Sequence, residues 1–295
     1  MANTELNHVP LVSVPRWNGV RLLSRARRGI VQLTIWGVWA VIVVAVGLYA
    51  YQAGRNLGRP AVITGYALFT VILLLGLFNL RKRLSMLPLI RARWWTTMHL
   101  SGGIAAFALL VLHVGLHWPT GVSEQTLLLL FYSVTISGLI GWMIERITPA
   151  RLTQTGIEVI FERIPTEVAN LREAAEVLMV RAAAQTGSDT LARVYLESFD
   201  WFFRRPRFLF NHIWGGRQGS AWVFRSIDTA RRYMNDEERK LLDELQVLAL
   251  LKNRLDFHYA AQGLTKVWLL LHVPLAVAVL VLGTWHLIIV NAYVL

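Results

Sequence analysis

Two apolar stretches with histidines at the same spacing decide the fold: WTTMHLSGGIAAFALLVLHVGLHW at residues 95–118 and VWLLLHVPLAVAVLVLGTWHLIIVNAYV at residues 267–294. Neither stretch contains Lys, Arg, Asp or Glu. Each is long enough to cross a hydrocarbon core of about 30 Å, which takes roughly 20 helical residues. Both stretches therefore predict membrane-spanning helices.

Three further stretches have the same character, at residues 30–52, 61–80 and 125–144. A charged side chain at the centre of such a helix would cost about 2.5–3.5 kcal/mol, and none is present in any of them. The first stretch follows a long basic segment and is too long for the apolar region of a signal peptide. With 55% hydrophobic residues and a mean hydropathy of +0.46, the chain is predicted to be an all-α membrane protein with five transmembrane helices.

The net charge of +12 is concentrated at two places beside these stretches. Five arginines precede the first stretch, and five basic residues separate the second from the third: Arg16, Arg21, Arg25, Arg27 and Arg28, then Arg81, Lys82, Arg83, Arg91 and Arg93. Basic flanks of this kind mark the cytoplasmic side rather than nucleic-acid binding. We expect an integral protein of a bacterial inner membrane with a cytoplasmic N-terminus and an outer C-terminus.

These boundaries predict four regions along the chain. They are a basic cytoplasmic segment at 1–29, four transmembrane helices at 30–145, a soluble helical insertion in the cytoplasm at 146–265, and a fifth transmembrane helix at 266–295. Within the insertion, Thr166 is expected to cap one helix, and Asn235 with Glu238 to form a capping box at the start of another. The aromatic residues Trp201, Phe202 and Phe203 beside three arginines suggest a docking surface or a solvated helix end.

Histidines occur at matched depths in the third and fifth spans. His99 and His113 are separated by the same number of residues as His272 and His286. Fourteen helical residues turn through about 1,400°, some 40° short of four turns, and rise about 21 Å. The two spans run in the same direction, so His99 is expected to face His272 near the cytoplasmic side, and His113 to face His286 near the outer side.

Two histidines at each level fit haem iron better than a bare metal ion. A zinc ion needs four ligands, and no Cys, Asp or Glu lies near either level. Haem iron already has four porphyrin nitrogens, so two axial histidines complete its coordination. A single membrane histidine often only bonds a neighbouring helix, but four at matched positions predict two haems. The absence of cysteine excludes covalently attached haem and cysteine-ligated iron–sulfur clusters on this chain.

The doubled His-x13-His pattern resembles the cytochrome b superfamily, in particular the ferric reductase type of membrane domain. The resemblance covers residues 30–145 and 266–294 and implies two haem b groups held by His99, His113, His272 and His286. It also implies electron transfer across the membrane. The chain lacks the Pro-Glu-Trp-Tyr sequence of quinol-oxidising cytochrome b, and no flavin or NADPH domain follows the last span.

The resemblance therefore favours an electron-transfer subunit of a larger respiratory or photosynthetic-type oxidoreductase complex. Its expected partners are a c-type cytochrome, an iron–sulfur protein or a flavin protein, in addition to membrane lipid. Two alternatives stay open: a quinone-reactive oxidoreductase subunit, and a non-redox membrane anchor or transporter. His117, one helical turn beyond His113, is a candidate accessory residue for a propionate or quinone contact, or a simple interfacial histidine.

Overall fold

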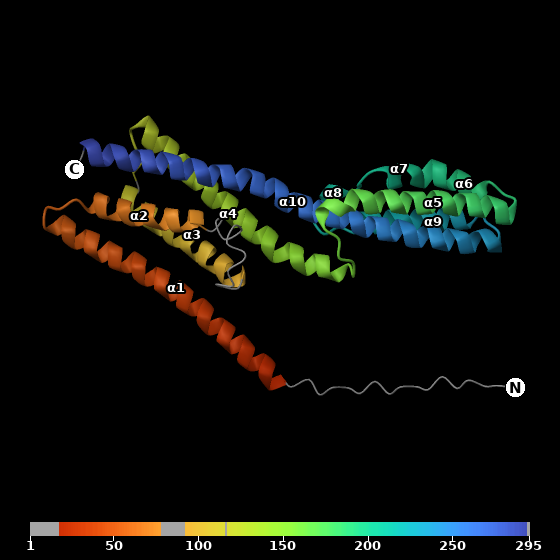
Figure 1. Cartoon of the computed structure of the whole chain (residues 1–295), viewed down its shortest axis with the longest axis horizontal. Coiled ribbons are helices and arrows are strands. Elements are labelled where there is room, and N and C mark those ends of the chain that lie inside the picture. Colours follow the sequence, from red (N-terminus) through yellow and green to blue (C-terminus); the bar gives the residue numbers. More distant parts are fainter. Residues whose placement is uncertain (1–17, 78–91, 116, 294–295) are drawn as a thin grey trace. The chain divides into compact units, whose positions relative to one another are not determined.

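A computed structural model describes residues 18–77, 92–115 and 117–293 (Figure 1). The described residues form helices and no strand. The longer helices are α1 (Asn18–Arg55), α2 (Pro60–Gly76), α3 (Ala92–Val114), α4 (Val122–Gln154), α5 (Ile164–Thr186), α9 (Gln218–Arg231) and α10 (Asp236–Tyr293). The short ones are η2 (Phe161–Arg163), α6 (Thr190–Val194), the π-helical turn η3 (Tyr195–Phe199), α7 (Asp200–Arg204) and α8 (Leu209–Ile213).

Four of these helices are long and apolar enough to cross a membrane: α1 from Gly29, α3 from Trp94, α4 and α10. The all-α prediction is therefore confirmed for the described residues, and the four long apolar helices support an integral membrane protein. Helix α2 is apolar but has only 17 residues, and the end of its expected span, together with the basic residues 81–83 and 91, lies outside the described residues. Five spans stay a prediction.

The chain divides into two units, each described here by itself. The first comprises residues up to Thr126 and from Leu280 onward, and the second comprises Leu127–Val279. In the first unit, α1, α2 and α3 pack together with the C-terminal end of α10. Small residues permit this close packing: a Cβ on Gly76 would lie 2.9 Å from Leu280 Cδ1, and one on Gly102 would lie 2.9 Å from Leu75 Cδ2.

The second unit contains the insertion between the fourth and fifth apolar stretches, in which α5 and α9 run alongside the first half of α10 (Figure 1). Its core includes Phe199, Phe202, Phe203, Leu242 and Leu245, all fully buried. Phe202 and Phe203 therefore hold the insertion together and do not form part of a docking surface.

Helix ends in the insertion follow local sequence signals. The expected capping box is confirmed, because the Glu238 backbone N–H donates to Asn235 Oδ1 at 2.8 Å and the Asn235 N–H donates to Glu238 Oε2 at 3.0 Å. The expected cap at Thr166 is wrong: α5 begins at Ile164, with Pro165 in its first turn. Proline suits that turn because its missing N–H would have no helical acceptor there.

Helix α10 joins the insertion to the membrane without a break. Its 58 residues correspond to about 87 Å of helix, so the last soluble helix and the last span are one element. The boundary expected at 265/266 falls inside this helix.

Candidate functional site

His113 and His286 lie next to each other in the first unit. His113 is in the last turn of α3, and His286 is near the C-terminal end of α10. Their ring centres are 6.4 Å apart, with the ring planes at 83°. The side-by-side placement expected for this pair from the sequence is therefore present.

The His113 ring is oriented by α2. Its Nδ1 lies 2.9 Å from the backbone oxygen of Ala61 and 3.3 Å from Thr64 Oγ1. A carbonyl oxygen only accepts, so Nδ1 carries the proton and donates it to Ala61. Thr64, 2% exposed, donates its own hydroxyl proton to backbone oxygens of its helix, which leaves the Thr64 oxygen able to accept from His113 as well.

This bond determines what the other ring nitrogen can do. With the proton on Nδ1, the His113 Nε2 keeps a lone pair and is available to a metal. Histidines that bind metals almost always donate their second ring N–H in this manner. Metal–imidazole nitrogen bonds are about 2.0–2.1 Å, so two imidazoles on opposite sides of one metal have ring centres about 6 Å apart, close to the observed 6.4 Å. The separation of the ring centres therefore suits two imidazoles that would hold one iron between them.

Gly65 is the residue that lets His113 approach α2 this closely. A Cβ at Gly65 would lie 2.8 Å from His113 Cε1 and 3.2 Å from Nδ1. Any side chain at this position would therefore push the His113 ring away from its acceptor. Neither Gly65 nor Thr64 was expected from the sequence. The available signal was the hydroxyl group of Thr64, one of few polar groups in the stretch at 61–80.

His272 is oriented by α4 within the second unit. Its Nδ1 lies 3.2 Å from Ser137 Oγ, where either group can donate. The Trp268 ring stacks on the His272 ring with centres 5.2 Å apart and planes at 23°. Trp268 is itself fixed, because its Nε1–H donates to the Ser137 carbonyl at 2.8 Å and its indole lies on Gly141, where a Cβ would be 2.0 Å away. Ser137, like Gly65 and Thr64, was not expected from the sequence.

His99 is on α3 and partly buried. It belongs to the first unit, whereas His272 belongs to the second. The pairing of His99 with His272 stays a prediction from the matched depths of the two residues in their spans.

The expectation that His117 lies one helical turn beyond His113 is wrong. Helix α3 ends at Val114, and Gly115 adopts a φ of 71°, which turns the chain out of the helix. His117 lies in the exposed connection after this turn, with its Nδ1 3.3 Å from where a Cβ of Gly115 would be. It does not share a helical face with His113, and its accessory or interfacial role stays a prediction.

The insertion holds a separate buried ion pair on α10. The Lys252 ammonium donates to Asp256 Oδ2 at 2.7 Å and to the Arg205 carbonyl at 2.7 Å, and both side chains are 0% exposed. Burial raises the pKa of Asp256 to about 6 and lowers the pKa of Lys252 to about 8. In each case burial outweighs the attraction between the partners. Nothing in this pair resembles a cofactor site, and we assign it a structural role.

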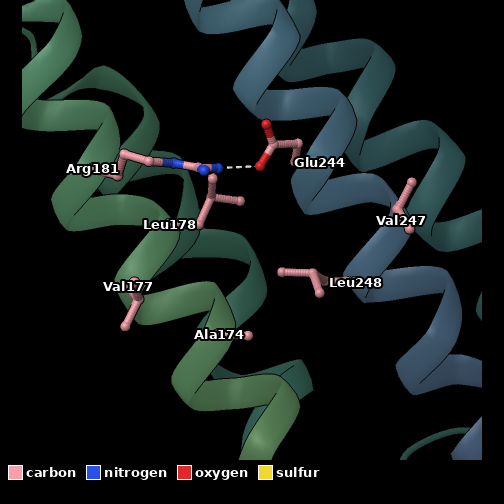
Figure 2. Close-up of a pocket in the computed structure, with 7 residues that line it drawn as sticks. All are labelled: Ala174, Val177, Leu178, Arg181, Glu244, Val247 and Leu248. Carbon is pink, nitrogen blue, oxygen red and sulfur yellow. Dashed lines mark hydrogen bonds and ion pairs between the residues drawn. The ribbon is translucent and has the colours of Figure 1, made fainter.

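A surface groove of about 470 Å³ runs between α5 and α10 in the insertion (Figure 2). An ion pair between Arg181 and Glu244 bridges one end of it, and alanine, valine and leucine side chains line the rest. It contains no histidine, hydroxyl or unpaired charge. We therefore place the candidate site at the histidines.

Among the described residues, no three His, Cys, Asp or Glu side chains are grouped so as to hold a metal ion. Comparison with protein-family models, with curated proteins and with solved structures gave no match for this chain.

Proposed function

We propose that this chain is a di-haem b-type cytochrome subunit that transfers electrons across the membrane within a larger redox complex. The observation that carries the proposal is the His113 and His286 pair. His113 presents an unprotonated Nε2, and the two rings have a separation that suits one metal between them. By the matched spacing, His99 and His272 would hold the second haem about 21 Å away along the membrane normal.

Bound haem would supply one-electron redox chemistry at each level. The contribution of this chain is ligation and orientation. The Ala61 carbonyl holds the His113 ring and increases the electron density of its Nε2. Trp268 and Ser137 restrict the His272 ring in the same way. In a bilayer, the apolar helices around both levels would limit the access of water to the haems.

The ends of the electron path belong to other chains in this proposal. A c-type cytochrome, an iron–sulfur protein or a flavin protein would donate or accept electrons, because this chain has no cysteine to bind a covalent haem or an iron–sulfur cluster. A quinone is the other candidate donor, and quinol-dependent haem reduction by the purified chain would identify that class.

Haem quantitation on the purified full chain tests the proposal. We expect two b-type haems per chain, and loss of one in each of His113→Ala and His286→Ala. His286→Met should retain the haem with a changed spectrum, because a thioether also binds haem iron. His117→Ala, in the exposed connection, is the matched control and should retain both. A colourless wild-type protein, or two haems in the His113→Ala/His286→Ala double variant, would overturn the proposal.

A further inference from the structure

Helix α8 and the turn after it expose two large aromatic side chains on one face. Phe210 is 82% exposed and Trp214 is 84% exposed, and they are four residues apart, one helical turn. His212, between them, faces inward: it is 4% exposed, and its ring lies 6.0 Å from that of Phe257 on α10. The contact between buried His212 and Phe257 therefore fixes which face of α8 points outward.

This face is attached to the cytoplasmic end of a membrane span. Arg151 on α4 donates from Nη1 to the Ile213 carbonyl at 3.0 Å, and its guanidinium lies 2.9 Å from where a Cβ of Gly215 would be. Gly215 has a φ of 78°, so this position suits a residue without a side chain. The end of α8 and its turn are thus held against α4.

The attachment places α8 near the lipid headgroups. Arg151 comes seven residues after Ile144, the last residue of the uncharged part of α4, which is about 10 Å along the helix. On α10, Phe257 precedes the boundary residue Lys266 by nine residues, or about 14 Å. The headgroup layer extends about 5–8 Å beyond the hydrocarbon. Aromatic side chains directed toward the membrane from this level reach that layer.

The charge around α8 matches an anionic surface. Residues 201–227 contain five arginines and no Asp or Glu. Arg204 is paired with Asp200 at 2.6 Å, whereas Arg205, Arg217 and Arg225 are exposed. Basic residues next to a span attract anionic lipids by about 1 kcal/mol each, and Trp is enriched at the membrane interface because it combines an apolar ring with an N–H donor.

We infer that α8 and its turn form an interfacial anchor, in which Phe210 and Trp214 lie among anionic phospholipid headgroups of the cytoplasmic leaflet and Arg217 contacts their phosphates. Exposed aromatic residues can also receive a protein partner. The membrane is favoured here because the face is bonded to the end of a span. The inference does not depend on the presence of haem.

The absence of cysteine makes a direct test simple. Phe210→Cys and Trp214→Cys variants of the full chain are spin-labelled and placed in nanodiscs of phosphatidylcholine with phosphatidylglycerol; each keeps the other aromatic residue. Tyr233→Cys is the matched control: Tyr233 is 77% exposed and precedes α10, whose start lies about 45 Å along that helix from Lys266.

Collision of the label with oxygen and with a water-soluble nickel complex gives its depth. We expect the oxygen-to-nickel accessibility ratio to be several-fold higher at 210 and 214 than at 233. The ratio at 214 should fall when phosphatidylglycerol is omitted, and Arg217→Gln should remove that lipid dependence. Equal ratios at all three positions would overturn the inference and leave the face open to water or to a protein partner.

Discussion

Replacing Gly65 with alanine should change the redox potential of one haem and leave the other unchanged. The added Cβ would lie 2.8 Å from His113 Cε1, whereas ordinary contact begins near 3.4 Å, so the ring must move by about 0.6 Å. Gly65 and Ala61 are on the same face of α2, so this movement lengthens the bond from Nδ1 to the Ala61 oxygen from 2.9 Å to about 3.5 Å. At that distance the hydrogen bond is largely lost.

The size of the change follows from the value of that bond. A hydrogen bond of this type contributes about 0.5–1.5 kcal/mol, and 1.36 kcal/mol corresponds to about 59 mV for one electron. Donation to the carbonyl makes the imidazole more electron-rich and favours ferric iron. Its loss should therefore raise the midpoint potential of the haem that His113 is proposed to hold, by at most about 20–65 mV, because only the part of the bond energy that differs between ferric and ferrous iron changes the potential.

A spectroelectrochemical titration of the full chain in nanodiscs, fitted to two one-electron components, measures this shift. The control is Gly103→Ala, since a Cβ at Gly103 would meet nothing within 4 Å. It adds the same methyl group to a transmembrane helix and should leave both potentials unchanged. An unshifted potential in Gly65→Ala, a downward shift, or equal shifts of both components would refute the reasoning.

Two further predictions concern the second unit. Gly141→Ala should displace Trp268 from His272, because the new Cβ would lie 2.0 Å from the indole. Spectral quantitation should then show that one proposed haem is altered or lost. Gly138→Ala is the control and should retain both haems, because its Cβ would lie at an ordinary contact distance of 3.7 Å from His272 Cε1. Lys252→Met should destabilise the insertion by about 3–5 kcal/mol at pH 7, because it leaves the Asp256 carboxylate buried without its partner. Burial raises the pKa of Asp256 to about 6 even though the Lys252 charge lowers it, so without Lys252 the folded state should take up a proton at a higher pH still. The penalty should therefore shrink as the pH falls and grow as the pH rises. Hydrogen exchange of residues 200–213 in the full chain, expressed as the opening free energy after correction for the intrinsic exchange rate at each pH, measures this loss. Lys252→Met with Asp256→Leu should recover most of it. A difference in opening free energy between Lys252→Met and the wild type that does not change with pH would contradict the assignment.

Features that depend on local sequence were predictable. The apolar stretches indicated the long helices, and the capping box at Asn235 formed as expected, because its partners are three residues apart. The proximity of His113 and His286 followed from helical geometry. The other contacts between distant helices could not be predicted, because hydrophobic periodicity does not show which helix faces meet. Thr64, Gly65 and Ser137 gained their positions beside histidines only through packing.

Two errors came from residues that override a pattern. Gly115 ends α3 before His117, although the apolar stretch continues past it. Pro165 occupies the first turn of α5, so the helix starts before Thr166, the residue with the better capping side chain. A glycine therefore decided where α3 ends, although the hydropathy continues past it, and a proline decided where α5 starts, although a better capping side chain follows.

The unbroken course of α10 makes it a rigid connection between the insertion and the last apolar span. A twist applied to the insertion by a partner would reach His272 through an uninterrupted helix. Pro274 follows two residues later and has no N–H to donate to the turn before it, so stiffness falls between His272 and His286. Torsion from the insertion would thus act on His272 and be damped before it reaches His286.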